Sequence, residues 1–160
     1  MKYGAQSPEE LTTREEILSM SGLAFMQGIM TGDIAGAPIA RTLNFQLLSV
    51  EDGRVVFSGV PEFGALNPTG AVHGGWYGAL LDSALGCAVM TKVAQGSVYT
   101  TLEYKVNITR AIPVGTEVHC EAVTDHAGRS TAVAHGTIRG AEDGRVYATG
   151  STTCTIMNLT

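Results

Sequence analysis

One long apolar stretch, residues 67–93, constrains the fold more than any other part of the chain. It reads NPTGAVHGGWYGALLDSALGCAVMTKV, contains the longest apolar run of the protein, and carries a single carboxylate, Asp82. Pro68 and the glycines at positions 70, 74 and 75 disfavour an early helix start. No proline interrupts the residues from Trp76 onward, which are rich in Ala, Leu and Met. We therefore predict a loop that leads into one buried helix.

The predicted helix has two unlike sides at about 100° per residue. The side expected to pack in the core carries Tyr77, Leu80, Leu81, Ala84 and Ala88. The opposite side carries Gly75, Gly78, Ala79, Asp82 and Gly86. Each internal glycine costs a helix roughly 1 kcal/mol relative to alanine. We therefore expect another backbone or a ligand to lie close to the small side, where the carboxylate is.

The segments on either side of this helix favour β-strands. Asp52-Gly53 is a strong hairpin signal between residues 43–50 and 55–60. Four further strands are expected after the helix, at residues 98–109, 116–124, 130–138 and 146–156. Residues 8–30 predict an N-terminal helix, which Ser21-Gly22 favours dividing in two, and residues 32–38 predict a loop. An antiparallel sheet with one helix covering a face is an α+β fold.

Strict alternation within residues 98–109 predicts a half-buried strand with Thr100 on the core side and Thr101 on the polar side. A bulge in the strand would change which threonine faces the helix.

With 160 residues, the chain is expected to form one domain, 37–160, preceded by a helical segment, 1–36.

Composition narrows the classes of function. The net charge of −5 argues against a nucleic-acid-binding protein. The cysteines at positions 87, 120 and 154 lack Cys-x-x-Cys spacing and His119, His126 and His135 lack metal-ligand spacing, so we predict neither a metal site nor a disulfide framework. Asp82 and Lys92 interrupt the apolar stretch, which argues against a membrane span. We expect a cytoplasmic protein with no cofactor, nucleic-acid partner or membrane partner.

The pattern Asn67-x-x-Gly70-x-x-His73-Gly74-Gly75, followed by Asp82 on the helix, resembles the signature of hotdog-fold acyl-CoA thioesterases. The most similar branch is the phenylacetate-degradation type, with its 4-hydroxybenzoyl-CoA thioesterase relatives. Thr101-x-Glu103-x-x-Val106-Asn107 resembles the family's third strand, and Gly128-Arg129 resembles its next turn. The resemblance implies a curved antiparallel sheet of about six strands wrapped round one central helix.

The resemblance also implies roles for individual residues. Asp82 would act as general base or nucleophile, the Gly75 N–H would polarise the thioester carbonyl, Asn67 and His73 would shape the site, and Thr101 would help to place water. Substrate contacts are expected from Gly74, Trp76, Thr100, Gly128, Arg129 and Ser130. Two alternatives remain open here: Asn67 could serve only as a turn residue, and His73 could serve only as a cap.

Spacing adds a physical constraint. A helix N-terminus offers unpaired N–H groups and partial positive charge to a developing oxyanion. Gly75 and Asp82 are seven residues apart, about 10 Å along a helix. One carbonyl group cannot contact both, so the two groups are expected to come from different subunits. We predict a homodimer in which the strands at 98–109 pair, and a homotetramer built as a dimer of dimers.

The resemblance implies acyl-CoA hydrolysis as the function, with acyl-CoA as the partner. Two alternatives remain: a hotdog acyl-thioester dehydratase or hydratase, and a non-catalytic acyl-CoA-binding protein. His-Gly-Gly at a helix start favours hydrolysis. Trp76, Tyr77, Phe63 and the methionines are compatible with aryl and medium aliphatic acyl groups alike.

Overall fold

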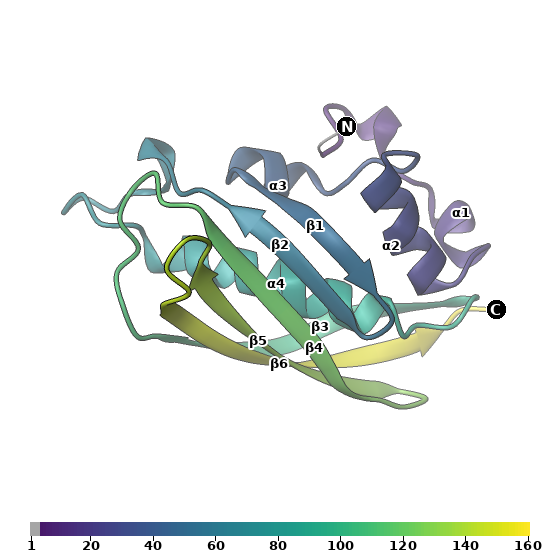
Figure 1. Ribbon diagram of the computed structural model, residues 1–160. Helices are drawn as coiled ribbons and strands as arrows, with labels where there is room; N and C mark the ends of the chain where they lie inside the picture. Colours follow the sequence, from purple (N-terminus) through teal and green to yellow (C-terminus); the bar gives the residue numbers. More distant parts are fainter. Residues whose placement is uncertain (1–3) are drawn as a thin grey trace.

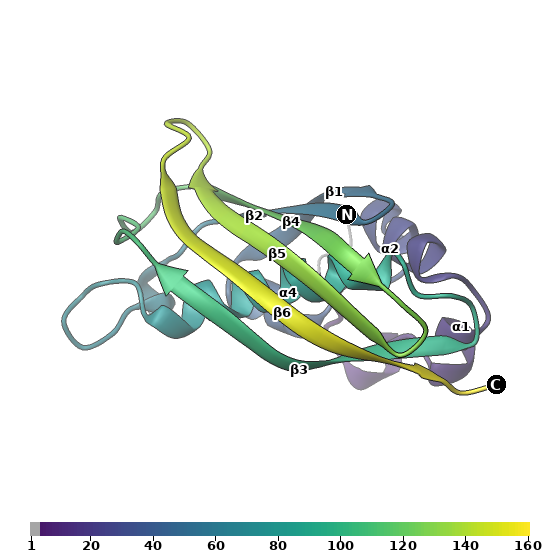
Figure 2. The ribbon, with the colours of Figure 1, turned by 90° about the horizontal axis from the view of Figure 1, so that it is seen from below.

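A six-stranded antiparallel sheet wraps round one long helix, α4 (Gly74–Met90), in the computed structural model, which describes residues 4–160 (Figures 1 and 2). The strand order is β1-β2-β4-β5-β6-β3. The strands are β1 (Phe45–Glu51), β2 (Arg54–Gly59), β3 (Ser97–Ile108), β4 (Val118–Ala127), β5 (Thr131–Gly140) and β6 (Val146–Asn158). The predicted α+β class and hotdog architecture are confirmed.

The N-terminal segment is more divided than predicted. It forms η1 (Pro8–Glu10), α1 (Arg14–Leu18), α2 (Gly22–Thr31) and, between the expected loop and the first expected strand, α3 (Pro38–Thr42). The expected break at Ser21 is confirmed, because the Ser21 side chain caps α2 by accepting the Ala24 N–H. The single helix over 8–30 is otherwise wrong, since Thr13 and Glu16 form a capping box that starts α1 separately.

The large side of α4 forms the core, as predicted. Tyr77, Leu80, Leu81, Ala84 and Ala88 are all buried against the inner face of the sheet. The helix nevertheless starts at Gly74, two residues before Trp76. His73 makes this start possible, because its Nδ1 accepts the otherwise unpaired Gly75 N–H at 2.8 Å. A short 3-10 turn, η2 (Phe63–Ala65), precedes the connecting loop.

The small side of α4 packs against the chain's own third strand. A side chain at Gly78 would lie 3.3 Å from the Tyr104 hydroxyl, and one at Gly86 would collide with the Tyr99 hydroxyl. The two glycines therefore make room for two tyrosines of β3. The expectation that another backbone or a ligand approaches at these two positions is wrong, because the tyrosine rings occupy the space.

A bulge interrupts the alternation of β3. Thr101 pairs with Cys154 and Glu103 with Thr153, so Leu102 is the extra residue. Tyr99 and Thr101 before the bulge, and Tyr104 after it, consequently face α4. Thr100 is exposed. A bulge is the feature that could turn Thr101 toward the helix, and the structure contains it. Strict alternation, which placed Thr100 in the core, is wrong.

The cysteines are free thiols, with Cys120 and Cys154 buried and Cys87 half-buried. No group of three His, Cys, Asp or Glu residues within 4–160 is placed to hold a metal ion. Over the same residues, none of the helices has the length and apolar character needed to cross a membrane. The division into residues 1–36 and 37–160 stays a prediction.

A buried threonine fastens the end of α4 to the β1–β2 turn. Thr91 Oγ1 accepts the Gly53 N–H at 2.8 Å and donates to the Ala88 carbonyl at 2.7 Å. Thr91→Val keeps the shape but leaves a buried N–H unpaired. We expect the free energy of unfolding to fall by about 1–3 kcal/mol. Urea denaturation measures this; Thr131→Val, at an exposed strand position, is the control. Equal stability of the two variants would contradict the assignment.

Candidate active site

Asp82 and Thr101 meet between α4 and β3. Thr101 Oγ1 donates a hydrogen bond to Asp82 Oδ1 at 3.1 Å, and both side chains are half-buried. Nothing else in residues 4–160 bonds to the carboxylate, so Asp82 Oδ2 is open to a ligand or water. The bulge at Leu102 produces this contact by turning Thr101 toward the helix. Two residues that the sequence pattern singled out for catalysis therefore lie together.

The N-terminus of α4 is organised by His73. Its Nδ1 accepts the Gly75 N–H, so the neutral imidazole carries its proton on Nε2. The N–H that the sequence analysis assigned to the substrate carbonyl is therefore already engaged within the chain. The adjacent Gly74 N–H has no partner among the described residues. Both glycines are exposed, so a substrate can reach this backbone.

Asn67 shapes the loop that precedes the helix. Its Oδ1 accepts the Thr69 N–H at 2.9 Å, the Thr69 hydroxyl at 2.7 Å and the Ala71 N–H at 3.2 Å. The His73 N–H then donates to the Ala65 carbonyl at 2.8 Å, which fixes the end of the loop. Asn67 therefore acts as a turn residue, which is one of the two roles expected for it. It positions His73 through the backbone.

A cavity of about 590 Å³ lies beside Asp82. Asp82, Ser83 and Thr101 provide polar groups on its α4 and β3 side. Most of the remaining wall is apolar and comes from α2, β1, β2 and α4, with Phe25, Met26, Ile29, Met30, Phe45, Leu47, Phe57 and Met90. A carboxylate at the wall of an apolar cavity is the usual composition of a small-molecule site.

Cys87 also lines this cavity, one and a half helical turns beyond the carboxylate. Burial, with the negative charge of Asp82 as a smaller cause, raises the pKa of the Cys87 thiol to about 12. The thiol therefore stays protonated at neutral pH, and a thiolate nucleophile is not available there. Asp82 is the group at this wall that can act as a base or nucleophile.

The structure does not bring the other expected substrate contacts to Asp82 within one chain. Trp76 is 2% exposed, and its indole N–H donates to the Leu43 carbonyl at 2.8 Å, which makes it a core residue. Thr100 faces solvent, on the other side of β3 from Thr101. Gly128, Arg129 and Ser130 form the exposed β4–β5 turn, at the end of the sheet away from the N-terminus of α4 (Figure 1).

The contribution of α2 to this cavity was not expected from the sequence. Residues 8–30 were predicted to be helical, without a role in the site. Phe25, Met26, Ile29 and Met30 of α2 line the cavity, and Met26 is also buried in the core. No local pattern indicates that this helix lies at the same cavity as Asp82, because the two segments are far apart in sequence.

The geometry can be compared with known proteins. The family model described as the thioesterase superfamily matches residues 69–148, or 80 of the 160 residues. The chain belongs to the thioesterase superfamily. The match includes the loop after Asn67, all of α4 and the β3 bulge, whereas α2 lies outside it. No curated protein matches the chain.

Solved structures with similar folds include proteins described as thioesterases or as phenylacetic acid degradation proteins. A phenylacetic acid degradation-related protein from Ralstonia eutropha is 26% identical with a TM-score of 0.74, over 82% of this chain and 98% of that one. A phenylacetic acid degradation protein from Thermus thermophilus is 25% identical with a TM-score of 0.67, over 74% and 97%. A hypothetical thioesterase from Streptococcus pneumoniae with coenzyme A is 25% identical with a TM-score of 0.66, over 72% and 88%. The chain is accordingly a thioester hydrolase, as predicted.

Proposed function

We propose that this protein hydrolyses acyl-CoA thioesters to a free acid and coenzyme A, with Asp82 as the group that activates the attack. The observation that carries the proposal is the Asp82 carboxylate, held by Thr101 at the wall of an apolar cavity. The coenzyme A in the Streptococcus pneumoniae structure supports the choice of thioester. The cavity takes the acyl group, and the carboxylate lies where the thioester carbon enters it.

Two roles for Asp82 fit this geometry. As general base, it takes a proton from a water molecule that attacks the thioester carbon; the C–S bond then breaks, and coenzyme A leaves as a thiolate that takes up this proton. As nucleophile, its own oxygen attacks and the C–S bond breaks to release the coenzyme A thiolate; water then hydrolyses the mixed anhydride to the free acid and the Asp82 carboxylate, and the thiolate takes up a proton released in that step. The Thr101 hydroxyl donates to Asp82 Oδ1 and keeps its lone pairs free to accept from water, so it positions both the carboxylate and the water molecule.

The Gly74 N–H is the donor that we assign to the developing oxyanion. The sequence pattern pointed to Gly75, but that N–H donates to His73. Gly74 is the first residue of α4, so its N–H has the partial positive charge of the helix N-terminus. With Nδ1 used as the cap acceptor, His73 can offer its Nε2–H to the same oxygen. Preorganised donors of this kind stabilise an oxyanion strongly.

The distance along α4 separates the two groups. Gly74 and Asp82 are eight residues apart, which is about 12 Å at 1.5 Å per residue. A single thioester carbonyl cannot bond to Gly74 and lie beside Asp82 of one chain. We therefore propose that each site combines Gly74 of one subunit with Asp82 of the other, in a two-fold homodimer.

The edge strand β3 is the surface that we propose for dimerisation. It has twelve residues, ends the sheet, and exposes large apolar side chains: Leu102 62%, Tyr104 47% and Ile108 48%. The other edge, β1, is flanked by α2 and α3 (Figure 1). An unprotected apolar edge is usually paired. Homotetramer formation stays a prediction.

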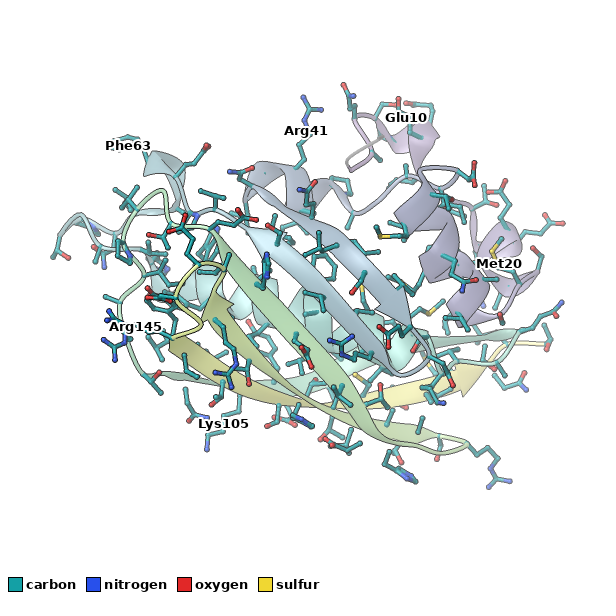
Figure 3. All side chains as sticks on the ribbon, viewed as in Figure 1. Glu10, Met20, Arg41, Phe63, Lys105 and Arg145 are labelled. Carbon is teal, nitrogen blue, oxygen red and sulfur yellow. The ribbon has the colours of Figure 1, made fainter. Side chains whose placement is uncertain are left out.

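Antiparallel pairing of two β3 strands would also reverse one subunit relative to the other. The start of α4 in one chain would then lie toward the end of the sheet that holds Arg129 in the other. Phe63 lies beside the loop before α4 and is 87% exposed. Its side chain and that of Lys105 on β3 project from the surface of the single chain (Figure 3). In the proposed dimer, Arg129 approaches the entrance of the shared site, where the coenzyme A phosphates would lie.

Thr101→Val tests the role of the hydroxyl. The variant keeps the β-branched shape on β3 but cannot hold Asp82 or water. We expect kcat to fall by roughly 10- to 100-fold, the scale of about 1.5–3 kcal/mol for a hydrogen bond to a charged group. Thr100→Val, on the exposed side of the same strand, is the matched control for strand propensity. The two kcat values are measured by steady-state kinetics. An equal loss of kcat in Thr101→Val and Thr100→Val would show that the Thr101 hydroxyl has no specific role.

The proposed function is tested by release of free coenzyme A thiol from a panel of acyl-CoA thioesters. Parallel assays with enoyl- and 3-hydroxyacyl-CoA would detect addition or loss of water across the carbon chain. We expect thiol release and no change at the double bond. Turnover only in the second assay would overturn the proposal.

A further inference from the structure

We propose that α2 forms the far wall of the acyl pocket and limits the substrate to unsubstituted aliphatic acyl chains on the order of ten carbons. The inference rests on the proposed function and adds the substrate class. It concerns a helix outside the stretch that the family model matches.

Several contacts fasten α2 to the body of the protein. The Gly22 N–H at the start of α2 donates to the Val93 carbonyl at 2.9 Å, and the preceding helix, α1, is held by the Gly96 N–H, which donates to the Leu18 carbonyl at 3.0 Å. A side chain at Gly22 would collide with the Met90 carbonyl at the end of α4, so the helix start lies directly on that backbone. Met26 is buried in the core. A helix held in this way provides a fixed wall.

The wall that α2 contributes has no hydrogen-bonding side chain. Phe25, Met26, Ile29 and Met30 face the cavity from α2, and Met90 faces it from α4. A hydroxyl or amino group on the acyl moiety would lose its water against this wall without gaining a partner, which is unfavourable. The wall therefore favours a hydrocarbon tail that lacks polar substituents.

The volume of the cavity and the flexibility of the methionine side chains that line it favour an aliphatic chain. At roughly 30 Å³ for each methylene-sized group, close to the share of a water molecule in the liquid, 590 Å³ sets an upper limit of about 20 groups. Packing against irregular walls leaves room for a chain of medium length. The three methionines are flexible and fill gaps around a chain that itself bends.

Chain-length profiles test this inference. Hydrolysis of butanoyl- to hexadecanoyl-CoA is compared with hydrolysis of phenylacetyl-CoA, and binding of the corresponding S-alkyl-CoA thioethers is measured by calorimetry. We expect affinity for the thioethers to rise roughly fourfold for each methylene buried, until the pocket is full at medium length. The thioethers cannot be hydrolysed, so binding is measured independently of the catalytic step.

Substitutions at Ile29 then locate the wall. Ile29→Trp should shorten the preferred chain by about two to four carbons, and Ile29→Ala should extend it, because a larger or smaller side chain moves the end of the pocket. Leu23→Trp is the matched control, since Leu23 is half-buried on α2 and does not line the cavity. Phe25→Ala provides a second enlarging variant if the tryptophan variant unfolds.

The outcomes separate this inference from the proposed function. Opposite shifts in the two Ile29 variants, with an unchanged profile in Leu23→Trp, support the wall. If acyl-CoA is hydrolysed but the chain-length profile is unchanged by substitution of Ile29 and Phe25, or if phenylacetyl-CoA is the best substrate, the inference is overturned. The proposed function is not affected by either result. Absence of hydrolysis of every thioester, with length-dependent thioether binding, overturns the proposed function instead.

Discussion

Replacing Asp82 by asparagine is expected to lower kcat for thioester hydrolysis by about a hundred- to ten-thousand-fold. The amide cannot take a proton from water or attack a thioester. Its side-chain oxygen can still accept the hydrogen bond from Thr101, which now spans 3.1 Å to Oδ1. Because Asp82 is half-buried and the two side chains have nearly the same shape, stability should change little.

The measurement for Asp82→Asn is kcat and melting temperature on the same preparation. Asp125→Asn makes the same chemical change at an exposed carboxylate on β4, so it controls for the loss of charge. A structural carboxylate would give the reverse result, with a lowered melting temperature and a nearly normal kcat for the folded protein.

Replacing Gly74 by proline is expected to lower kcat by roughly a hundred- to a thousand-fold, the effect of losing one oxyanion donor. Proline removes the N–H and nothing else that the fold uses here. It is favoured at the first helical position, and the preceding residue, His73, already has the extended conformation that proline requires, with ψ of 137°. The Gly75 N–H can keep its bond to His73.

Gly74→Ala is the matched variant, because it retains the N–H and adds only a methyl group. That methyl would lie 3.5 Å from Ile108 Cδ1, an ordinary contact. With one acyl-CoA substrate, we expect a near-normal kcat for Gly74→Ala and a folded Gly74→Pro variant whose kcat is reduced to the extent given above. Normal turnover in Gly74→Pro would place the oxyanion donor at another group.

Local sequence signals predicted the fold well where they were strong. The apolar spacing of Tyr77, Leu80 and Leu81 identified the buried side of α4, and Asp52-Gly53 identified the first hairpin. The exact start of α4 at Gly74 was not predicted, because intrinsic propensity counts Gly74 and Gly75 against a helix. Propensity does not include the bond from the Gly75 N–H to His73 that compensates for them.

The candidate site was less accessible to sequence reasoning. Asp82 stood out as the one carboxylate in an apolar helix, but its contact with Thr101 depends on a bulge that alternation alone does not reveal. The glycines at positions 78 and 86 indicated close packing without indicating that Tyr104 and Tyr99 are the partners. The α2 wall depends on tertiary packing that brings residues 25–30 to the same cavity as Asp82, which no local pattern encodes.

Sharing of the site between subunits is tested most directly by mixing two inactive chains. Asp82→Asn and Gly74→Pro chains are co-expressed with different tags, and mixed dimers are purified by both tags. One of the two sites in each mixed dimer then combines an intact Gly74 with an intact Asp82, so activity should recover to about half of the wild-type value per dimer. Proven mixed dimers without recovered activity would place both groups in one subunit and contradict the account.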